Sequence, residues 1–214
     1  MRRPLLDAVF AVLAVLLSGF DAHAHPHVWA TIHSEAFFTS DGAIAGVRHI
    51  WTFDDMFSAL ALQGIPHAKK GQYTREELSS LARTNVTSLK EYNFFTYAKA
   101  DGKKLPFSDA VDYWLEYKDE ALTLHFTLPL KMPVKAPGIQ IEIYDPEIFV
   151  DLEFAKENPA SLAGAPPGCQ LKVELPHQPT ASEQLRLSQL DESPLDPSSA
   201  YGAVFANRIK ISCP

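Results

Sequence analysis

The chain has 214 residues, of which 46% are hydrophobic, and its 26 acidic residues against 19 basic ones give a formal net charge of −7 at pH 7. This hydrophobic content is enough to build a core, which argues against an intrinsically disordered chain. The sequence shows no cluster of Lys and Arg that could neutralise phosphates, which argues against nucleic-acid binding and against binding to anionic lipid headgroups.

The first 24 residues have the features of a cleavable signal peptide. A basic start is followed by an uninterrupted apolar run from Ala8 to Leu17, and Ala22-His23-Ala24 supplies the small-x-small pattern that a signal peptidase requires. A membrane-spanning helix needs roughly 20 apolar residues, so this run is short for an anchor, although an uncleaved anchor is the alternative. We therefore expect residues 25–214 to form a single periplasmic domain with no membrane insertion after cleavage.

Two segments near the start of that domain predict a β-hairpin. Val28 to Thr39 is rich in β-branched and aromatic residues, and Ala43 to Phe53 reads as the returning strand. Ser40-Asp41-Gly42 lies between them, with a glycine available for a turn position of positive φ.

The main predicted helix covers residues 74–91. Thr74 and Glu77 fit a capping box, in which each side chain satisfies the free backbone N–H of the other residue. Apolar residues then recur at helical spacing to about Glu91.

The rest of the chain predicts mostly strands. Ala121 to Leu128 alternates apolar and polar residues, as a half-buried strand does, while Pro176 to Ser199 reads as loop with a short helix over Glu183 to Leu190. Further strands are expected at 92–98, 111–117, 139–144, 170–175 and 204–212. Short polar links between them favour antiparallel pairing. The predicted fold class is α+β, a β-rich antiparallel sheet or sandwich with one main helix.

The two cysteines, Cys169 and Cys213, predict a disulfide bond, because an even count of distant cysteines in an oxidising compartment is typical of one. Closing a loop of about 44 residues stabilises a fold by ~4 kcal/mol in the chain-entropy model. A thiolate metal pair is the alternative, but no other Cys or His lies close to either cysteine in the sequence.

Histidines gather at the start of the expected domain, where four of them fall within the predicted hairpin region: His25, His27, His33 and His49. Cleavage after Ala24 would let His25 bind one metal ion through both its α-amine and its imidazole, in the manner of a histidine brace. Such nitrogen donors suit Cu, Ni and Zn. Pro26 has no backbone N–H, which excludes a square-planar site made by deprotonated amides and leaves His27 to bind through its imidazole.

Strand geometry decides which of these histidines can meet. His25, His27 and His33 share parity, so all three can project from one face of a strand. The position of His49 depends on the turn, since a slip of one residue moves it to the other face. The alternatives are that the first histidines form a frayed end and that His33 and His49 only make hydrogen bonds within the sheet.

Asp54 and Asp55 follow the second predicted strand. Their carboxylates could complete a nitrogen and oxygen site for Zn, Ni or Co, or they could cap the next segment, where Asp is favoured. Asp145, before Pro146, has the same ambiguity because Asp-Pro commonly starts a turn. Common catalytic motifs such as G-x-S-x-G and H-E-x-x-H are absent from the sequence, so we do not predict an enzyme.

Several of these motifs resemble an uncharacterised bacterial family, formally a domain of unknown function, that is described as the periplasmic component of an ABC-type transport system. The residues that carry the resemblance are His25-Pro26-His27-Val28-Trp29, Trp51-Thr52-Phe53-Asp54-Asp55 with Ser58, Tyr144-Asp145-Pro146, Gly164-Ala165-Pro166 with Cys169, and Cys213-Pro214. Members are often found beside nickel/cobalt-type exporters or metal-uptake systems. The resemblance thus implies a metal context, with an inner-membrane metal transporter as partner, although the chain lacks the length of a two-lobed solute-binding protein.

The sequence therefore predicts a periplasmic accessory protein that binds Cu, Ni, Co or Zn for a metal transporter. Its predicted ligands are His25 and His27, completed by one of His33, His49, Asp54 and Asp55. Two alternatives stay open. One is a metal-free module that docks on a transporter through an exposed apolar patch of Phe94, Phe95 and Tyr97. The other is a copper-dependent oxidative enzyme built on the terminal histidine.

Overall fold

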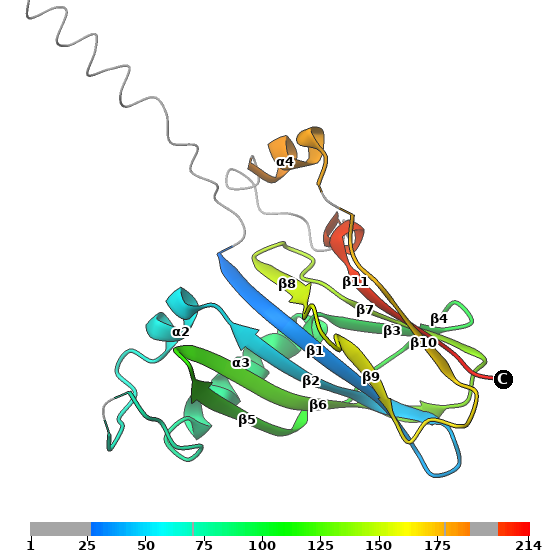
Figure 1. Cartoon of the computed structure of the whole chain (residues 1–214), viewed down its shortest axis with the longest axis horizontal. Helices are drawn as coiled ribbons and strands as arrows, with labels where there is room; N and C mark the ends of the chain where they lie inside the picture. Colours follow the sequence, from blue (N-terminus) through cyan, green and yellow to red (C-terminus); the bar gives the residue numbers. More distant parts are fainter. Residues whose placement is uncertain (1–26, 70, 178, 189–200) are drawn as a thin grey trace, which may run out of the picture.

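Two β-sheets packed face to face form the body of the fold (Figure 1). The structure is a computed structural model that describes residues 27–69, 71–177, 179–188 and 201–214. The predicted signal peptide and His25 lie outside these described residues. No helix within the described ranges is both long and apolar enough to cross a membrane.

The first sheet has strand order β5-β6-β2-β1-β8, and β9 also pairs with β1. Its strands are β1 (Val28–Phe38), β2 (Ile44–Phe53), β5 (Val111–Lys118), β6 (Ala121–Val134), β8 (Val150–Phe154) and β9 (Ala160–Ala163). The predicted hairpin is confirmed as β1 and β2, and Gly42 has the expected positive φ of 82° in its turn. Along its other edge, β1 pairs in parallel with β8 and then with β9, two short strands that the sequence did not predict.

The second sheet has strand order β10-β11-β7-β3-β4, and all its pairings are antiparallel. Its strands are β3 (Thr96–Ala100), β4 (Lys103–Leu105), β7 (Gly138–Ile143), β10 (Gln170–Glu174) and β11 (Asn207–Ser212). The predicted disulfide is confirmed between Cys169, just before β10, and Cys213, just after β11. The bond therefore ties together the ends of two strands that are already neighbours in the sheet.

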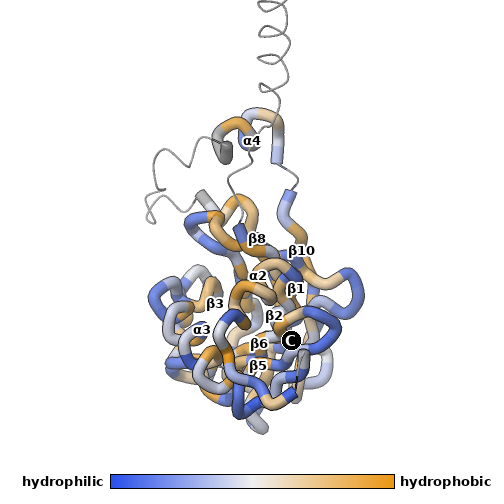
Figure 2. Tube along the Cα trace, turned by 90° about the vertical axis from the view of Figure 1, so that its left-hand side faces the viewer, coloured by the Kyte–Doolittle hydropathy of each residue, from blue (hydrophilic) through white to orange (hydrophobic). Residues whose placement is uncertain are grey.

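The core lies between the two sheets. Trp51 of β2 is packed edge-on against Phe126 of β6, with ring centroids 4.9 Å apart, and stacks on Phe95 at 6.3 Å. Isoleucines from β7 and β11 close the core from the second sheet. Helix α3 (Ser79–Glu91) packs beside β5 and buries Ala82 and Val86 in the same core. Hydrophilic residues gather in the peripheral loops (Figure 2).

Helix α3 is shorter than predicted. The capping box forms, since the Thr74 N–H donates to the Glu77 carboxylate (2.7 Å) and the Glu77 N–H donates to the Thr74 hydroxyl (3.2 Å). These bonds hold a turn over residues 75–78, and the helix itself begins only at Ser79. Two further helices are α2 (Asp55–Ala61), which was not predicted, and α4 (Ala181–Ser188), close to the predicted short helix.

The predicted apolar docking patch is wrong in its main members. Phe94 and Phe95 are each only 5% exposed, because they fill the space between α3 and the two sheets. Tyr97 is half-buried on the outer side of β3 and stacks on Tyr144, with ring centroids 4.6 Å apart. An exposed patch built from these three residues does not exist in the structure.

Candidate functional site

One face of the first sheet points away from the core, and no helix covers it in Figure 1. We call this the outer face. Residues that face each other on neighbouring strands project to the same side, so they form rows across the sheet. The two central rows are His33, Ile50, His125 and Trp114, and Thr31, Thr52, Thr123 and Glu116. Glu153 of β8 extends the threonine row beyond Thr31.

The register separates His33 from His49. His33 faces Ile50 and lies on the outer face, whereas His49 faces Ser34 and points into the core, where it is 1% exposed. Its two ring nitrogens form hydrogen bonds with the hydroxyls of Ser34 (2.9 Å) and Thr96 (3.2 Å). Burial lowers the pKa of His49 to about 3, which keeps the ring neutral. His49, one of the four candidates to complete the metal site, is therefore not on the outer face with His33, and it instead links the two sheets.

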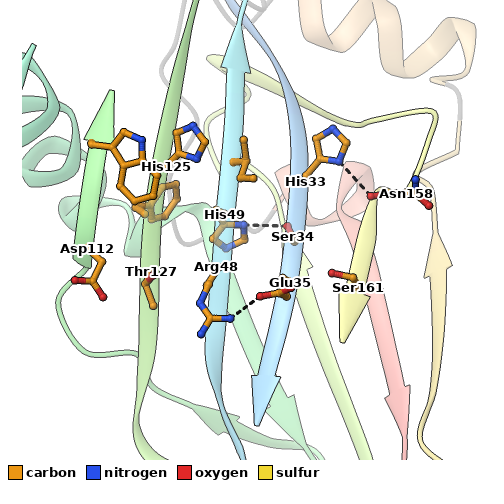
Figure 3. Close-up of a pocket in the computed structure, with 13 residues that line it drawn as sticks. His33, Ser34, Glu35, Arg48, His49, Asp112, His125, Thr127, Asn158 and Ser161 are labelled. Carbon is orange, nitrogen blue, oxygen red and sulfur yellow. Dashed lines mark hydrogen bonds and ion pairs between the residues drawn. The ribbon is translucent and has the colours of Figure 1, made fainter. Parts of the chain in front are cut away.

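A groove of about 320 Å³ opens on the outer face between the histidine row and the neighbouring row of Glu35, Arg48 and Thr127 (Figure 3). His125 stacks on Trp114, with ring centroids 4.5 Å apart, and its Nε2 lies 3.6 Å from the Glu116 carboxylate. Burial lowers the pKa of His125, against the opposing effect of Glu116. His33 Nδ1 donates a hydrogen bond to the carbonyl of Asn158 (3.1 Å), since a carbonyl oxygen only accepts.

The groove does not hold its two outward-facing histidines, His33 and His125, around one ion. His33 of β1 and His125 of β6 have the whole of β2 between them, so their backbones are about 10 Å apart. Ile50 of β2 lies between them in the same row, and ligand atoms lie only about 2 Å from a bound zinc ion.

A second cavity, of about 160 Å³, lies at the end of the outer face where β1 begins. It is lined by Trp29, Ala30, Thr31, Thr52, Phe53, Asp54, Asp151 and Glu153. Three of these residues are carboxylates and none is basic. We call this the acidic cavity. The pairing of β1 with β8 creates it, because Asp151 faces Trp29 and Glu153 faces Thr31 on the outer face.

Asp54 and Asp55, the two predicted aspartates, form hydrogen bonds that hold the start of α2. Asp54 is the N-cap of α2, where its Oδ1 accepts from the Phe57 N–H (2.8 Å) and its Oδ2 accepts from the Trp29 N–H (2.9 Å). It therefore ties β1 to the start of the helix. Asp55 is the first residue of α2 and accepts a hydrogen bond from the Met56 N–H. The capping role that the sequence left open is the one that Asp54 fulfils.

Asp151 and Glu153 differ from Asp54, because neither carboxylate forms a hydrogen bond or ion pair with any described residue. Burial raises the pKa of Asp151, and the nearby Glu153 raises it further. Two carboxylates that repel each other and have no cation beside them are a favourable place for a bound cation. Sequence analysis missed both residues because it did not recognise β8 as a strand.

His27 lies just before β1, and its backbone N–H donates to the carbonyl of Phe149 (2.9 Å). Its ring packs on the Phe149 ring, with centroids 4.7 Å apart. His27 and Phe149 are each two residues before Trp29 and Asp151, so they continue the same two strands on the same side of the sheet. His27 therefore lies at the entrance of β1, on the side of the sheet that carries the acidic cavity.

Comparison with known proteins places the chain in a family. Residues 10–213 match the family described as Protein of unknown function (DUF1007). The chain belongs to the DUF1007 family. It is similar to an uncharacterised protein of Haemophilus influenzae, with 23% identity over 95% of this chain and 98% of that protein. It is also similar to an uncharacterised 15.5 kDa protein of Spirochaeta aurantia, with 29% identity over 43% of this chain and 66% of that protein.

Two motif residues serve the fold in this DUF1007 member. Ser58 is fully buried, and its hydroxyl donates to the carbonyl of Asp54 (2.6 Å) and accepts from the Leu122 N–H (2.9 Å), which joins α2 to β6. The buried Asp145 carboxylate accepts hydrogen bonds from three backbone N–H groups, those of Glu147, Phe149 and Val150, and so shapes the turn that leads into β8. Asp145 is therefore a turn-forming residue, as one of its two predicted roles required.

Within residues 27–69, 71–177, 179–188 and 201–214, no group of three or more His, Cys, Asp and Glu side chains is close enough to hold a metal ion. A metal site at the acidic cavity would thus need donor groups from the preceding segment, which contains His25.

Proposed function

We propose that the protein is a periplasmic accessory of a metal transport system and binds a divalent transition metal at the acidic cavity. The observation that supports this best is the pair of carboxylates, Asp151 and Glu153, in a cavity beside His27 whose described lining residues include no basic side chain. A divalent cation would remove the repulsion between them and favour their ionised forms.

The proposed ligands come from β8 and from the residues just before β1. Asp151 and Glu153 supply carboxylate oxygens, His27 supplies an imidazole, and His25 supplies an imidazole and, after cleavage behind Ala24, an α-amine. Such a set of nitrogen and oxygen donors suits Cu, Ni, Co or Zn. His33 and His49 have no part in this site, and Asp54 contributes by holding Trp29 and α2 in place.

Isothermal titration of the mature protein tests the proposal. The protein is prepared with His25 as its first residue, dialysed against chelator, and titrated with each of the four metals. We expect at least a tenfold loss of affinity in H25A/H27A and also in D151N/E153Q, because each variant removes two donors. The matched control is H67A/H177A, which removes two exposed histidines elsewhere and should bind like the wild type.

Two results would contradict the site. The first is a wild-type protein that binds none of the four metals more tightly than the H25A/H27A and D151N/E153Q variants do. The second is a D151N/E153Q variant with unchanged metal affinity, which would show that the carboxylates of the acidic cavity are not ligands of the metal that the histidines bind. Placing one extra alanine before His25 isolates the contribution of the amine, because it moves that group out of reach and leaves both imidazoles.

A further inference from the structure

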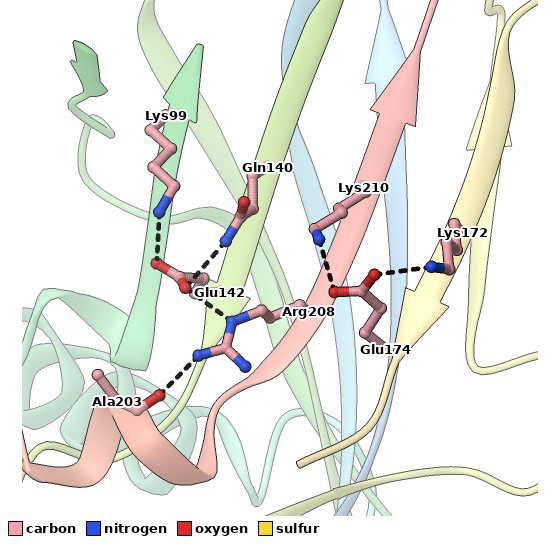
Figure 4. A network of polar contacts seen from close by, with 8 residues as sticks. All are labelled: Lys99, Gln140, Glu142, Lys172, Glu174, Ala203, Arg208 and Lys210. Atoms are coloured by element: carbon pink, nitrogen blue, oxygen red, sulfur yellow. Dashed lines mark hydrogen bonds and ion pairs between the residues drawn. The ribbon is translucent and has the colours of Figure 1, made fainter. Parts of the chain in front are cut away.

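The outward side of the second sheet carries a row of lysines that only the folded chain brings together (Figure 4). Neighbouring strands pair Lys172 with Lys210, Lys210 with Gln140, Gln140 with Lys99, and Lys99 with Lys104. We call these five residues the lysine row. The side chains of Lys172, Lys210 and Lys99 are 73%, 46% and 43% exposed, so their ammonium groups reach solvent.

Two glutamates in the adjacent row hold these cations in place. Glu174 forms ion pairs with Lys172 (2.9 Å) and Lys210 (2.7 Å), and those lysines lower its pKa to about 2. Glu142 forms ion pairs with Lys99 (3.5 Å) and Arg208 (2.9 Å).

The face stays positively charged in spite of these pairs. Among the described residues of these two rows, two carboxylates stand against five cations, counting Lys104 and Arg208, on a chain whose net charge is −7. Lysines directly opposite each other on paired strands repel, so this arrangement destabilises the sheet slightly. This surface is positively charged although the chain as a whole is negatively charged. We therefore expect its partner to be anionic.

We propose that the lysine row docks the protein on an anionic lipid surface, with the second sheet lying against the phosphate headgroups. Five adjacent strands place the charges along a row of about 19 Å, which matches an extended array of headgroups better than it matches a single anion. The lysine row itself has no apolar or aromatic residue, and the nearby Tyr97 is half-buried against Tyr144. Charge is therefore the main feature that this face offers, and charge is what an anionic lipid surface recognises, whereas a protein interface usually has a desolvated apolar or aromatic centre.

The acidic residues elsewhere on the chain do not prevent this contact. The two sheets of a sandwich are about 10 Å apart, so the acidic cavity on the outer face of the first sheet lies beyond one Debye length, about 10 Å at 0.1 M salt, from headgroups under the second sheet. The acidic cavity then faces away from the bilayer. Lipid docking is therefore independent of the metal site, and it is tested with chelator present throughout.

Sedimentation with vesicles measures the docking. The mature protein is mixed at about 0.1 M salt, where the Debye length is about 10 Å, with vesicles of phosphatidylcholine alone or of equimolar phosphatidylcholine and phosphatidylglycerol. We expect binding only to the anionic vesicles, lost at high salt, and weakened about a hundredfold in K99Q/K172Q/K210Q. The matched control K118Q/K131Q/K156Q removes three exposed lysines elsewhere and the same net charge, and it should bind like the wild type.

Equal binding to both kinds of vesicle, or no binding to either, would overturn the proposal. So would equal losses in the two triple variants, since net charge rather than the lysine row would then be responsible. Binding to polyglutamate without binding to anionic vesicles would assign the face to an acidic protein and would also overturn it. Circular dichroism of both variants at pH 7 establishes that they are folded.

Discussion

His49 should make the fold sensitive to mild acid. The ring is buried between Ser34 and Thr96, and its pKa is lowered from 6.5 to about 3 by burial. In the unfolded chain the same ring takes up a proton near pH 6.5. Stability is therefore fully present above that pH, and it falls as the pH decreases toward 3, because only the unfolded chain binds the proton.

The size of the effect follows from the two pKa values. One unit of pKa difference corresponds to about 1.4 kcal/mol. At about pH 5 the pH is roughly one and a half units below the pKa of the histidine in the unfolded chain. The free energy of unfolding should thus decrease by ~2 kcal/mol between pH 7 and pH 5 through this residue alone. That is a large share of the ~5–15 kcal/mol that typically stabilises a domain.

The assay compares the wild type with H49Q, in which the amide can still bond to one of the hydroxyls but does not titrate. Urea unfolding is followed by tryptophan fluorescence near pH 7, 6 and 5, where Trp51 is a direct reporter because its ring centroid lies 5.6 Å from that of His49. We expect the wild type to lose about 2 kcal/mol more than H49Q over this range. Parallel pH profiles would refute the reasoning. So would an NMR signal of the native His49 ring that titrates near pH 6.5, a test that needs no variant.

Three further changes have expected outcomes. S58A should lower the free energy of unfolding in urea by about 1–3 kcal/mol, because the buried Leu122 N–H loses its acceptor, and an unchanged midpoint would contradict this. Reducing the Cys169–Cys213 bond should cost ~4 kcal/mol by loop entropy, visible as a lower melting temperature with reductant and absent in a double serine variant. G46A should destabilise the fold by at least about 1 kcal/mol, because its Cβ would collide with the β6 backbone, and equal thermal stability would show that the two strands can separate there.

Local signals predicted the local parts of the fold. The β1–β2 hairpin was recognisable because both strands are long and a glycine sits at the turn, and the disulfide because only one pairing of two cysteines exists. The capping box at Thr74 was also correct, yet it closes a turn and leaves the helix to begin at Ser79. Such a motif specifies local hydrogen bonds, whereas tertiary packing decides at which residue the helix begins.

The candidate sites depend on pairings that no local pattern shows. Strands β8 and β9 have five and four residues, too few for a clear alternation, and parallel pairing with β1 leaves no turn signal between the partners. For this reason Asp151 and Glu153 were missed. The side of the sheet on which His49 lies was left open, because it depends on the register of the β1–β2 hairpin. The lysine row was invisible for the same reason, since its members are scattered from Lys99 to Lys210 in the sequence.

Strand β1 pairs in parallel with two strands that come much later in the sequence, and this affects the order in which the protein folds. Its antiparallel partner β2 is made at once, but its parallel partners begin only at Val150, more than a hundred residues later. A ribosome delivers the chain from its amino end, so one edge of β1 must wait, unpaired and open to other chains, until those residues arrive. We expect the growing chain to need protection at this edge, and premature truncation before β8 to produce aggregates rather than a smaller folded unit.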